Sequence, residues 1–282
     1  MRTLELHDGR QLAYEIWGDP DGTPVMFQHG TGDSRLARFP DESVRSELGI
    51  KLVTVDRPGV GGSTLMPDRT LMDWASDAEE LADALQLERF AIAGWSGGAP
   101  HALAMAQHMG DRISRVALAS PLAPFDTPGS RDLVLNKDLR MVWKLSHLKF
   151  LARMFAKHEA SKDTEDLNAF VHSIARDAPA DAPVLNDPQL HPMFEEEMGA
   201  ALSQGGVGVL DDMWAFLDWG FRPEDVTQHV EVLHGRDDEI LSAEMGRTLA
   251  ERLPDSAFRA LDGGHYTVFA HWPEFMSAAT AA

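Results

Sequence analysis

The stretch Phe90-Ala91-Ile92-Ala93-Gly94-Trp95-Ser96-Gly97-Gly98 places one serine between two kinds of predicted structure. The apolar run 90–93 is typical of a short buried strand, and the alanine-rich residues 99–109 predict a helix. The serine therefore lies in a tight strand-to-helix turn of the form G-x-S-x-G. Gly94 and Gly98 suit this turn because the strand and the helix come too close there for side chains.

Strands and helices alternate on both sides of this turn. We expect a hairpin at 2–6 and 11–17, strands at 25–28, 51–55, 113–119, 230–234 and 257–261, and helices at 71–87, 243–252 and from about 268. Such alternation predicts an α/β fold, a doubly wound, mostly parallel, twisted sheet flanked by helices.

The alternation stops for about a hundred residues after the sixth strand. No clear strand occurs there, and residues 132–156 and 210–217 have helical patterns. We therefore expect a helical cap, residues 124–225, inserted between two parts of the core, 1–123 and 226–282.

Composition restricts the class of protein. The 282 residues are 44% hydrophobic and 25% charged, with 25 Lys+Arg against 45 Asp+Glu and a net charge of −20. A surface with this negative charge repels nucleic acid and anionic membranes. We therefore expect a small-molecule substrate, and the oligomeric state stays open. The absence of cysteine, of a signal-type N-terminus and of a long apolar run predicts a cytoplasmic protein without a membrane span.

A serine hydroxyl needs a base and an acid before it can act as a nucleophile. His265 follows the last predicted strand, in Gly263-Gly264-His265-Tyr266, and we interpret it as the base. Asp237 and Asp238 follow the preceding strand, and their side chains point in different directions, so one of them is the expected acid. Asp126, after the sixth strand, is a further alternative. The order serine, acid, histidine is the one expected for a G-x-S-x-G turn in this type of sheet.

The negatively charged oxygen of the reaction also needs hydrogen-bond donors. We expect one from the amide of Gly97, directly after the serine, and one from the amide of Thr31 in the loop His29-Gly30-Thr31-Gly32. His29 is interpreted as a residue that holds this loop rather than as a second base.

These segments resemble the α/β-hydrolase superfamily, and specifically its smaller, lid-bearing, esterase-like serine hydrolases. The resemblance rests on His29–Gly32, Asp56-Arg57-Pro58-Gly59-Val60-Gly61-Gly62-Ser63, Gly94–Gly98, Gly235–Asp238 and Gly263–His265, which span the core but not the insertion. It implies the α/β-hydrolase fold. It also favours Asp238 as the acid, because related sequences place the acid three residues after the glycine that ends the strand. One departure is Ser242, where related sequences often have proline.

The resemblance implies a cofactor-free serine hydrolase without a metal, most simply a carboxylesterase for small or medium esters. Ser96 argues against the dehalogenases and epoxide hydrolases of the superfamily, whose nucleophile is Asp. The turn also differs from the Gly-Gly-Ser-Trp-Gly that is usual in proline iminopeptidases. A C–C hydrolase, a lactonase, an amidase or aminopeptidase, and a small-molecule receptor with slow turnover remain as alternatives.

Side chains that bind the substrate are harder to identify. We expect Trp95, Trp214 and Trp219 to line an apolar pocket under the cap, with Phe216 and Phe221 as further candidates. The run Glu195-Glu196-Glu197 could bind a substrate amine, but we interpret it as a solvated helix face.

Overall fold

The computed structural model describes residues 1–41, 47–144 and 146–281. Within them, an eight-stranded sheet has the order β1-β2-β4-β3-β5-β6-β7-β8. The strands are β1 (Arg2–Glu5), β2 (Gln11–Gly18), β3 (Thr23–Gln28), β4 (Ile50–Val55), β5 (Phe90–Trp95), β6 (Ile113–Ala119), β7 (Val230–Gly235) and β8 (Ser256–Leu261). β2 runs antiparallel to β1 and β4, and the other neighbours are parallel. The predicted mostly parallel α/β sheet is therefore confirmed.

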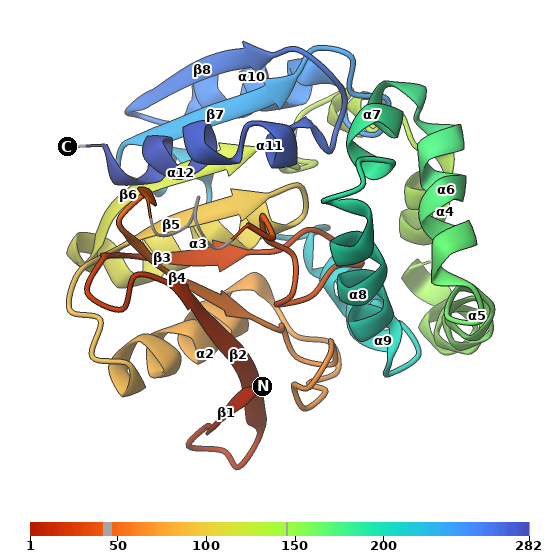
Figure 1. Ribbon diagram of the computed structural model, residues 1–282, viewed down its shortest axis with the longest axis horizontal. Helices are drawn as coiled ribbons and strands as arrows, with labels where there is room; N and C mark the ends of the chain where they lie inside the picture. The colour runs from red at the N-terminus through yellow and green to blue at the C-terminus, as the bar shows by residue number, and fades with distance from the viewer. Residues whose placement is uncertain (42–46, 145, 282) are drawn as a thin grey trace.

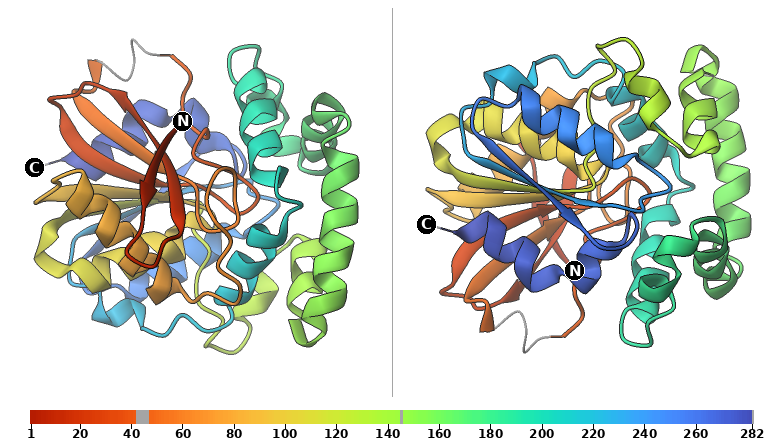
Figure 2. Two further views of the ribbon diagram at one scale, coloured as in Figure 1. Left: turned by 90° about the horizontal axis from the view of Figure 1, so that it is seen from below. Right: turned by 90° about the horizontal axis from the view of Figure 1, so that it is seen from above.

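Helices bury both faces of this sheet (Figure 2). Side chains of a strand alternate between its two faces, and on β5 Phe90 and Ile92 belong to one apolar cluster while Ala91 and Ala93 belong to the other. The first cluster includes α2 (Leu71–Ala84), α3 (Gly98–Met109) and α10 (Ala243–Arg252). The second includes α11 (Thr267–Ala270) and α12 (Trp272–Thr280). Burial on both faces explains why the central strands are apolar runs.

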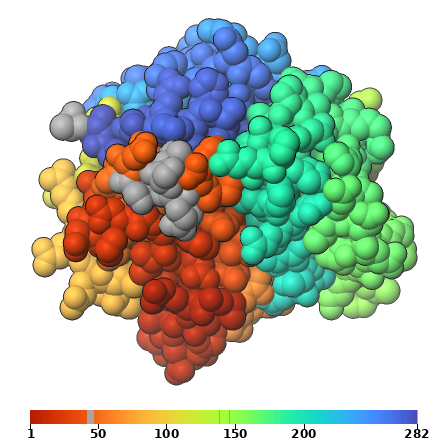
Figure 3. All heavy atoms as spheres, in the orientation of Figure 1, coloured from red at the N-terminus to blue at the C-terminus, as the bar shows by residue number. Residues whose placement is uncertain are grey.

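The chain between β6 and β7 is helical and lies beyond the carboxyl ends of the parallel strands (Figure 1). Its α-helices are α4 (Lys137–Lys144), α5 (Lys149–Asp163), α6 (Leu167–Asp177), α7 (Ala182–Leu185), α8 (His191–Leu202) and α9 (Val207–Ala215). Figure 3 shows these helices packed against the core. The assignment of residues 124–225, hereafter the cap, as a separate domain stays a prediction.

The expected helix at 132–156 is divided into shorter helices. Asn136 directly precedes α4, and its Oδ1 accepts a hydrogen bond from the amide of Leu139 at 3.1 Å, so it caps the start of that helix. No helix among the described residues is long and apolar enough to cross a membrane.

Candidate active site

Ser96 lies in a strained turn between β5 and α3. Its φ is 54°, in the left-handed region that residues other than glycine rarely adopt. A Cβ at Gly98 would lie 2.1 Å from the carbonyl oxygen of Gln28, and one at Gly94 would lie 2.9 Å from the Cβ of Ala102. Both glycines are therefore required by the close packing of strand and helix.

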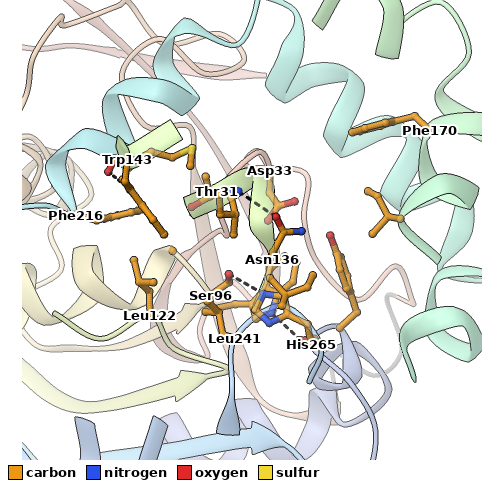
Figure 4. A pocket seen from close by; sticks show the side chains of 17 residues that line it. Thr31, Asp33, Ser96, Leu122, Asn136, Trp143, Phe170, Phe216, Leu241 and His265 are labelled. Carbon is orange, nitrogen blue, oxygen red and sulfur yellow. Dashed lines mark hydrogen bonds between the residues drawn. The ribbon is translucent and has the colours of Figure 1, made fainter. Parts of the chain in front are cut away.

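Ser96, His265 and Asp238 form a continuous hydrogen-bonded chain, and Figure 4 shows its bond between Ser96 and His265. The Oγ of Ser96 lies 2.8 Å from Nε2 of His265, and Nδ1 of His265 lies 2.7 Å from Oδ2 of Asp238. The other oxygen of Asp238 accepts the amides of Ile240 and Leu241, both at 2.8 Å. These bonds fix the carboxylate, and hence the ring that faces it.

The two other acids that the sequence offered lie elsewhere. Asp237 is exposed, although it is the neighbour of Asp238. Asp126 forms a bidentate ion pair with Arg252 near the surface, at 2.7 and 2.8 Å. The carboxylate hydrogen-bonded to His265 is therefore that of Asp238.

The buried charges in this chain stabilise one another. Burial alone would raise the pKa of Asp238, but His265 and His234 outweigh it and hold that pKa well below its usual range. Burial alone would lower the pKa of His265, yet the Asp238 carboxylate raises it above its ordinary value. The arrangement therefore combines an ionised carboxylate with a histidine of increased basicity.

The two expected oxyanion donors lie in segments that approach each other closely. Thr31 and Gly97 both line the cavity at Ser96, and a Cβ at Gly97 would lie 2.0 Å from the Oγ1 of Thr31. The carbonyl of Ser96, in the same peptide group as the Gly97 amide, accepts bonds from the amides of Ala99 and Leu122 at 3.1 and 3.2 Å. That peptide group is therefore held in one orientation.

A buried ionic network supports the other segment. The guanidinium of Arg57 donates to the carbonyls of His29 and Gly30 at 2.7 and 2.8 Å, and to Asp212 of α9 at 2.8 Å. Asp212 also accepts from Arg69, and it lies 3.2 Å from Nε2 of His101. No local sequence pattern indicates this network, because Asp212 comes from a cap helix and its partners come from the core.

His29 itself faces the loop rather than a reacting group. Its Nδ1 lies 2.8 Å from the carbonyl oxygen of Gly30. Complete burial, with the nearby Arg57, holds the pKa of His29 well below its ordinary value. Its ring is therefore neutral, as suits a residue that supports the loop.

A cavity of about 310 Å³ opens at Ser96 between the core and the cap. Most of its lining is apolar, and its polar side chains are Thr31, Asp33, Ser96, Asn136 and His265. Its aromatic side chains are Trp95, Trp143, Phe170, Phe216 and Tyr266. Such a cavity suits a small, largely apolar substrate.

Two of the three expected tryptophans do not line this cavity. Trp95 does, but Trp214 packs under Lys149 and Arg153, whose charged groups lie 5.0 and 5.1 Å from its ring. Trp219 packs against Phe221, with the ring centroids 5.5 Å apart. The apolar composition of the cap could not distinguish side chains that face the cavity from those that fill the cap interior.

The interpretation of residues 195–197 as a solvated helix face was wrong for one of them. Glu196 is exposed, but Glu197 is completely buried. Its Oε2 accepts the amide of Ser34 at 3.1 Å, so α8 is joined to the loop after β3. Among the described residues, no group of three or more His, Asp or Glu side chains is arranged to hold a metal ion.

Comparisons with known proteins agree with this architecture. The model of the alpha/beta hydrolase fold family matches residues 23–271. An uncharacterized hydrolase, YcgS, of Bacillus subtilis (strain 168) is 28% identical over 145 residues, 49% of this chain and 50% of the relative. A proline iminopeptidase of Arabidopsis thaliana is 32% identical over 123 residues, 41% of this chain and 31% of the relative. The chain thus spans half or less of the length of these curated relatives.

A solved structure matches over the full chain. The crystal structure of a hydrolase from Pseudomonas aeruginosa PA01 has a TM-score of 0.72 at 18% identity, and the match covers 100% of this chain and 98% of the other. This likeness concerns the fold, and the family model covers most of the same residues. The chain belongs to the alpha/beta hydrolase fold family.

Proposed function

We propose that this protein is a serine hydrolase that needs no cofactor and cleaves small or medium carboxylic esters. The observation that carries the proposal is the chain from Ser96 Oγ through His265 to Asp238, with distances of 2.8 and 2.7 Å. In this arrangement the histidine can remove the serine proton while the carboxylate stabilises the resulting imidazolium.

The reaction follows from these positions. Ser96 Oγ attacks the ester carbonyl carbon as Nε2 of His265 takes its proton, and the carbonyl oxygen becomes an oxyanion. The amides of Thr31 and Gly97 stabilise that charge, each by about 2.7–4 kcal/mol if it resembles known oxyanion donors. His265 then protonates the leaving alcohol, and an acyl group remains on Ser96. A water molecule, deprotonated by His265, releases the acid and restores the serine.

The cavity supports a small substrate with an apolar body. Leu122, Leu139, Ile174 and Leu241 line it together with the aromatic side chains named above. Such a lining favours acyl and alkyl chains over highly charged polymers.

A fluorophosphonate probe followed by intact-mass measurement tests the nucleophile. We expect one adduct on the wild type and none on Ser96→Ala. A panel of p-nitrophenyl esters of increasing chain length, a lactone and an anilide then tests the type of bond. Turnover of the anilide but not of the esters would replace the esterase with an amidase, and labelling without turnover of any substrate would favour the receptor.

A further inference from the structure

The cavity contains an acid that the esterase mechanism does not use. Asp33 directly follows the loop His29–Gly32, is only 3% exposed, and is one of the polar side chains at Ser96 (Figure 4). A Cβ at residue 30 would lie 2.2 Å from its Oδ2, so Gly30 is what allows the carboxylate to lie against this loop. A buried carboxylate is costly unless it has partners.

Its side-chain hydrogen-bond partner is a second carboxyl group, that of Glu197, and the backbone of Gly30 is a further partner. Two carboxyl groups in contact must share a proton, because both cannot be charged at this distance. Oε2 of Glu197 already accepts the Ser34 amide, whereas its buried Oε1 has no donor. The proton therefore belongs on Oε1 of Glu197, which donates it to an ionised Asp33.

Burial raises the pKa of both groups, that of Asp33 to about 6. The guanidinium of Arg57 lowers the pKa of Asp33, but it donates its hydrogen bonds to Asp212 and to two backbone carbonyls. Among the described residues, no Lys or Arg side chain forms an ion pair with Asp33. Asp33 thus presents one negative charge to the cavity near neutral pH.

That charge opposes the proposed reaction unless the substrate compensates for it. An oxyanion develops beside Thr31, two residues from Asp33, and a neighbouring negative charge raises its energy. A cation on the substrate would remove this penalty and would also give Asp33 an ion-pair partner.

We propose that Asp33, with the proton-bearing Glu197 behind it, binds a positively charged nitrogen of the substrate, so that the preferred esters carry an ammonium group near the reacting carbonyl. This inference rests on the proposed esterase function. Glu197 acts as a positioning residue, because it orients the carboxylate of Asp33 and does not face the substrate itself.

Two pairs of esters that differ in one charge test the proposal. Butyl 3-aminopropanoate and butyl butanoate place an ammonium or a methyl group on the acyl side. Choline butanoate and 3,3-dimethylbutyl butanoate do the same on the alcohol side. We expect the wild type to prefer the cationic member of at least one pair by about tenfold or more in kcat/KM, the effect of a close charge pair.

Asp33→Asn should abolish this preference. Asparagine can still accept a hydrogen bond from the protonated Glu197, so the fold is retained, but asparagine carries no charge. The cationic ester should lose at least about tenfold in kcat/KM, while its neutral partner is hydrolysed as fast as before or faster. Glu197→Gln keeps a donor for Asp33 and should keep the preference. Glu196→Gln removes one exposed negative charge from the same helix as Glu197, and it should change kcat/KM for neither ester.

If Asp33 only stabilised the fold, Asp33→Asn would lower kcat/KM equally for both esters of a pair, and that result would overturn the proposal. So would a wild type that prefers the neutral ester in both pairs. A readout independent of ester turnover separates this outcome from failure of the esterase proposal. Choline should slow fluorophosphonate labelling of Ser96 in the wild type but not in Asp33→Asn, and 3,3-dimethylbutanol should slow neither. If Ser96 is not labelled at all, the esterase proposal fails, and calorimetric titration with choline then tests Asp33 by itself.

Discussion

Arg57 donates a hydrogen bond from Nη2 to the carbonyl oxygen of Gly30 at 2.8 Å. That carbonyl belongs to the same peptide group as the amide of Thr31, and the two ends of a trans peptide point in opposite directions. The bond therefore fixes where the Thr31 N–H points. A positive charge at the oxygen end also polarises the peptide, which makes the N–H a stronger donor. Because Asp212 of α9 holds Arg57, the cap contributes to the geometry of the oxyanion site.

Arg57→Lys should therefore weaken catalysis more than substrate binding. A lysine cannot donate to both loop carbonyls and to Asp212, so kcat should fall by about ten- to a hundredfold with little change in KM. The affinity for a trifluoromethyl ketone, which forms the oxyanion, should fall by a similar factor. Arg69→Lys is the control, since Arg69 shares Asp212 but donates to Gly208 rather than to the loop. A higher KM at unchanged kcat would contradict this role.

The rate should increase with pH as His265 loses its proton. Only the neutral ring accepts the serine proton, and Asp238 raises the pKa of His265 above the ordinary 6.5, so kcat/KM should reach half its maximum above that pH. Asp238→Asn removes the carboxylate and should reduce kcat by about 10⁴-fold. Steady-state rates from about pH 5 to 8 on a substrate whose chemistry limits the rate provide the check, and a flat profile would contradict the assignment.

Local patterns in the sequence were sufficient to predict the sheet, Ser96 and His265, whereas the choice of Asp238 over Asp237 depended on the family resemblance. Ser96, Asp238 and His265 each follow a strand, and parallel strands bring their carboxyl ends to one edge of the sheet. The partners Arg57 and Asp212 are separated by 155 residues, and no local pattern indicates that a cap helix brings them together. The same holds for Asp33 and Glu197, so the charged contacts between cap and core required the structure.

Asp212→Asn should destabilise the fold strongly. Arg57 and Arg69 outweigh the effect of burial and hold the pKa of Asp212 well below its usual range. Its ionised form therefore stabilises the fold above the unfolded-state pKa of about 3.9, and this contribution is lost as the pH falls through the lower folded-state value. Removing the charge leaves two buried guanidinium groups uncompensated, and urea unfolding at neutral pH should show a loss of about 3–5 kcal/mol. The exposed Asp218→Asn is the control, and a similar small loss in both variants would refute this account.

Trp143 and Trp219 are both buried in the cap, but of these two only Trp143 lines the cavity. Trp143→Leu should enlarge the cavity and raise kcat/KM on the longest ester that the wild type cleaves poorly by about tenfold relative to the shortest. Trp219→Leu should also cost stability, because it leaves a void, yet the ranking of esters by chain length should stay unchanged. Rates on the p-nitrophenyl series at a temperature where both variants are folded provide the comparison. A shift of the ranking by Trp219→Leu alone would mean that this cavity does not hold the acyl chain.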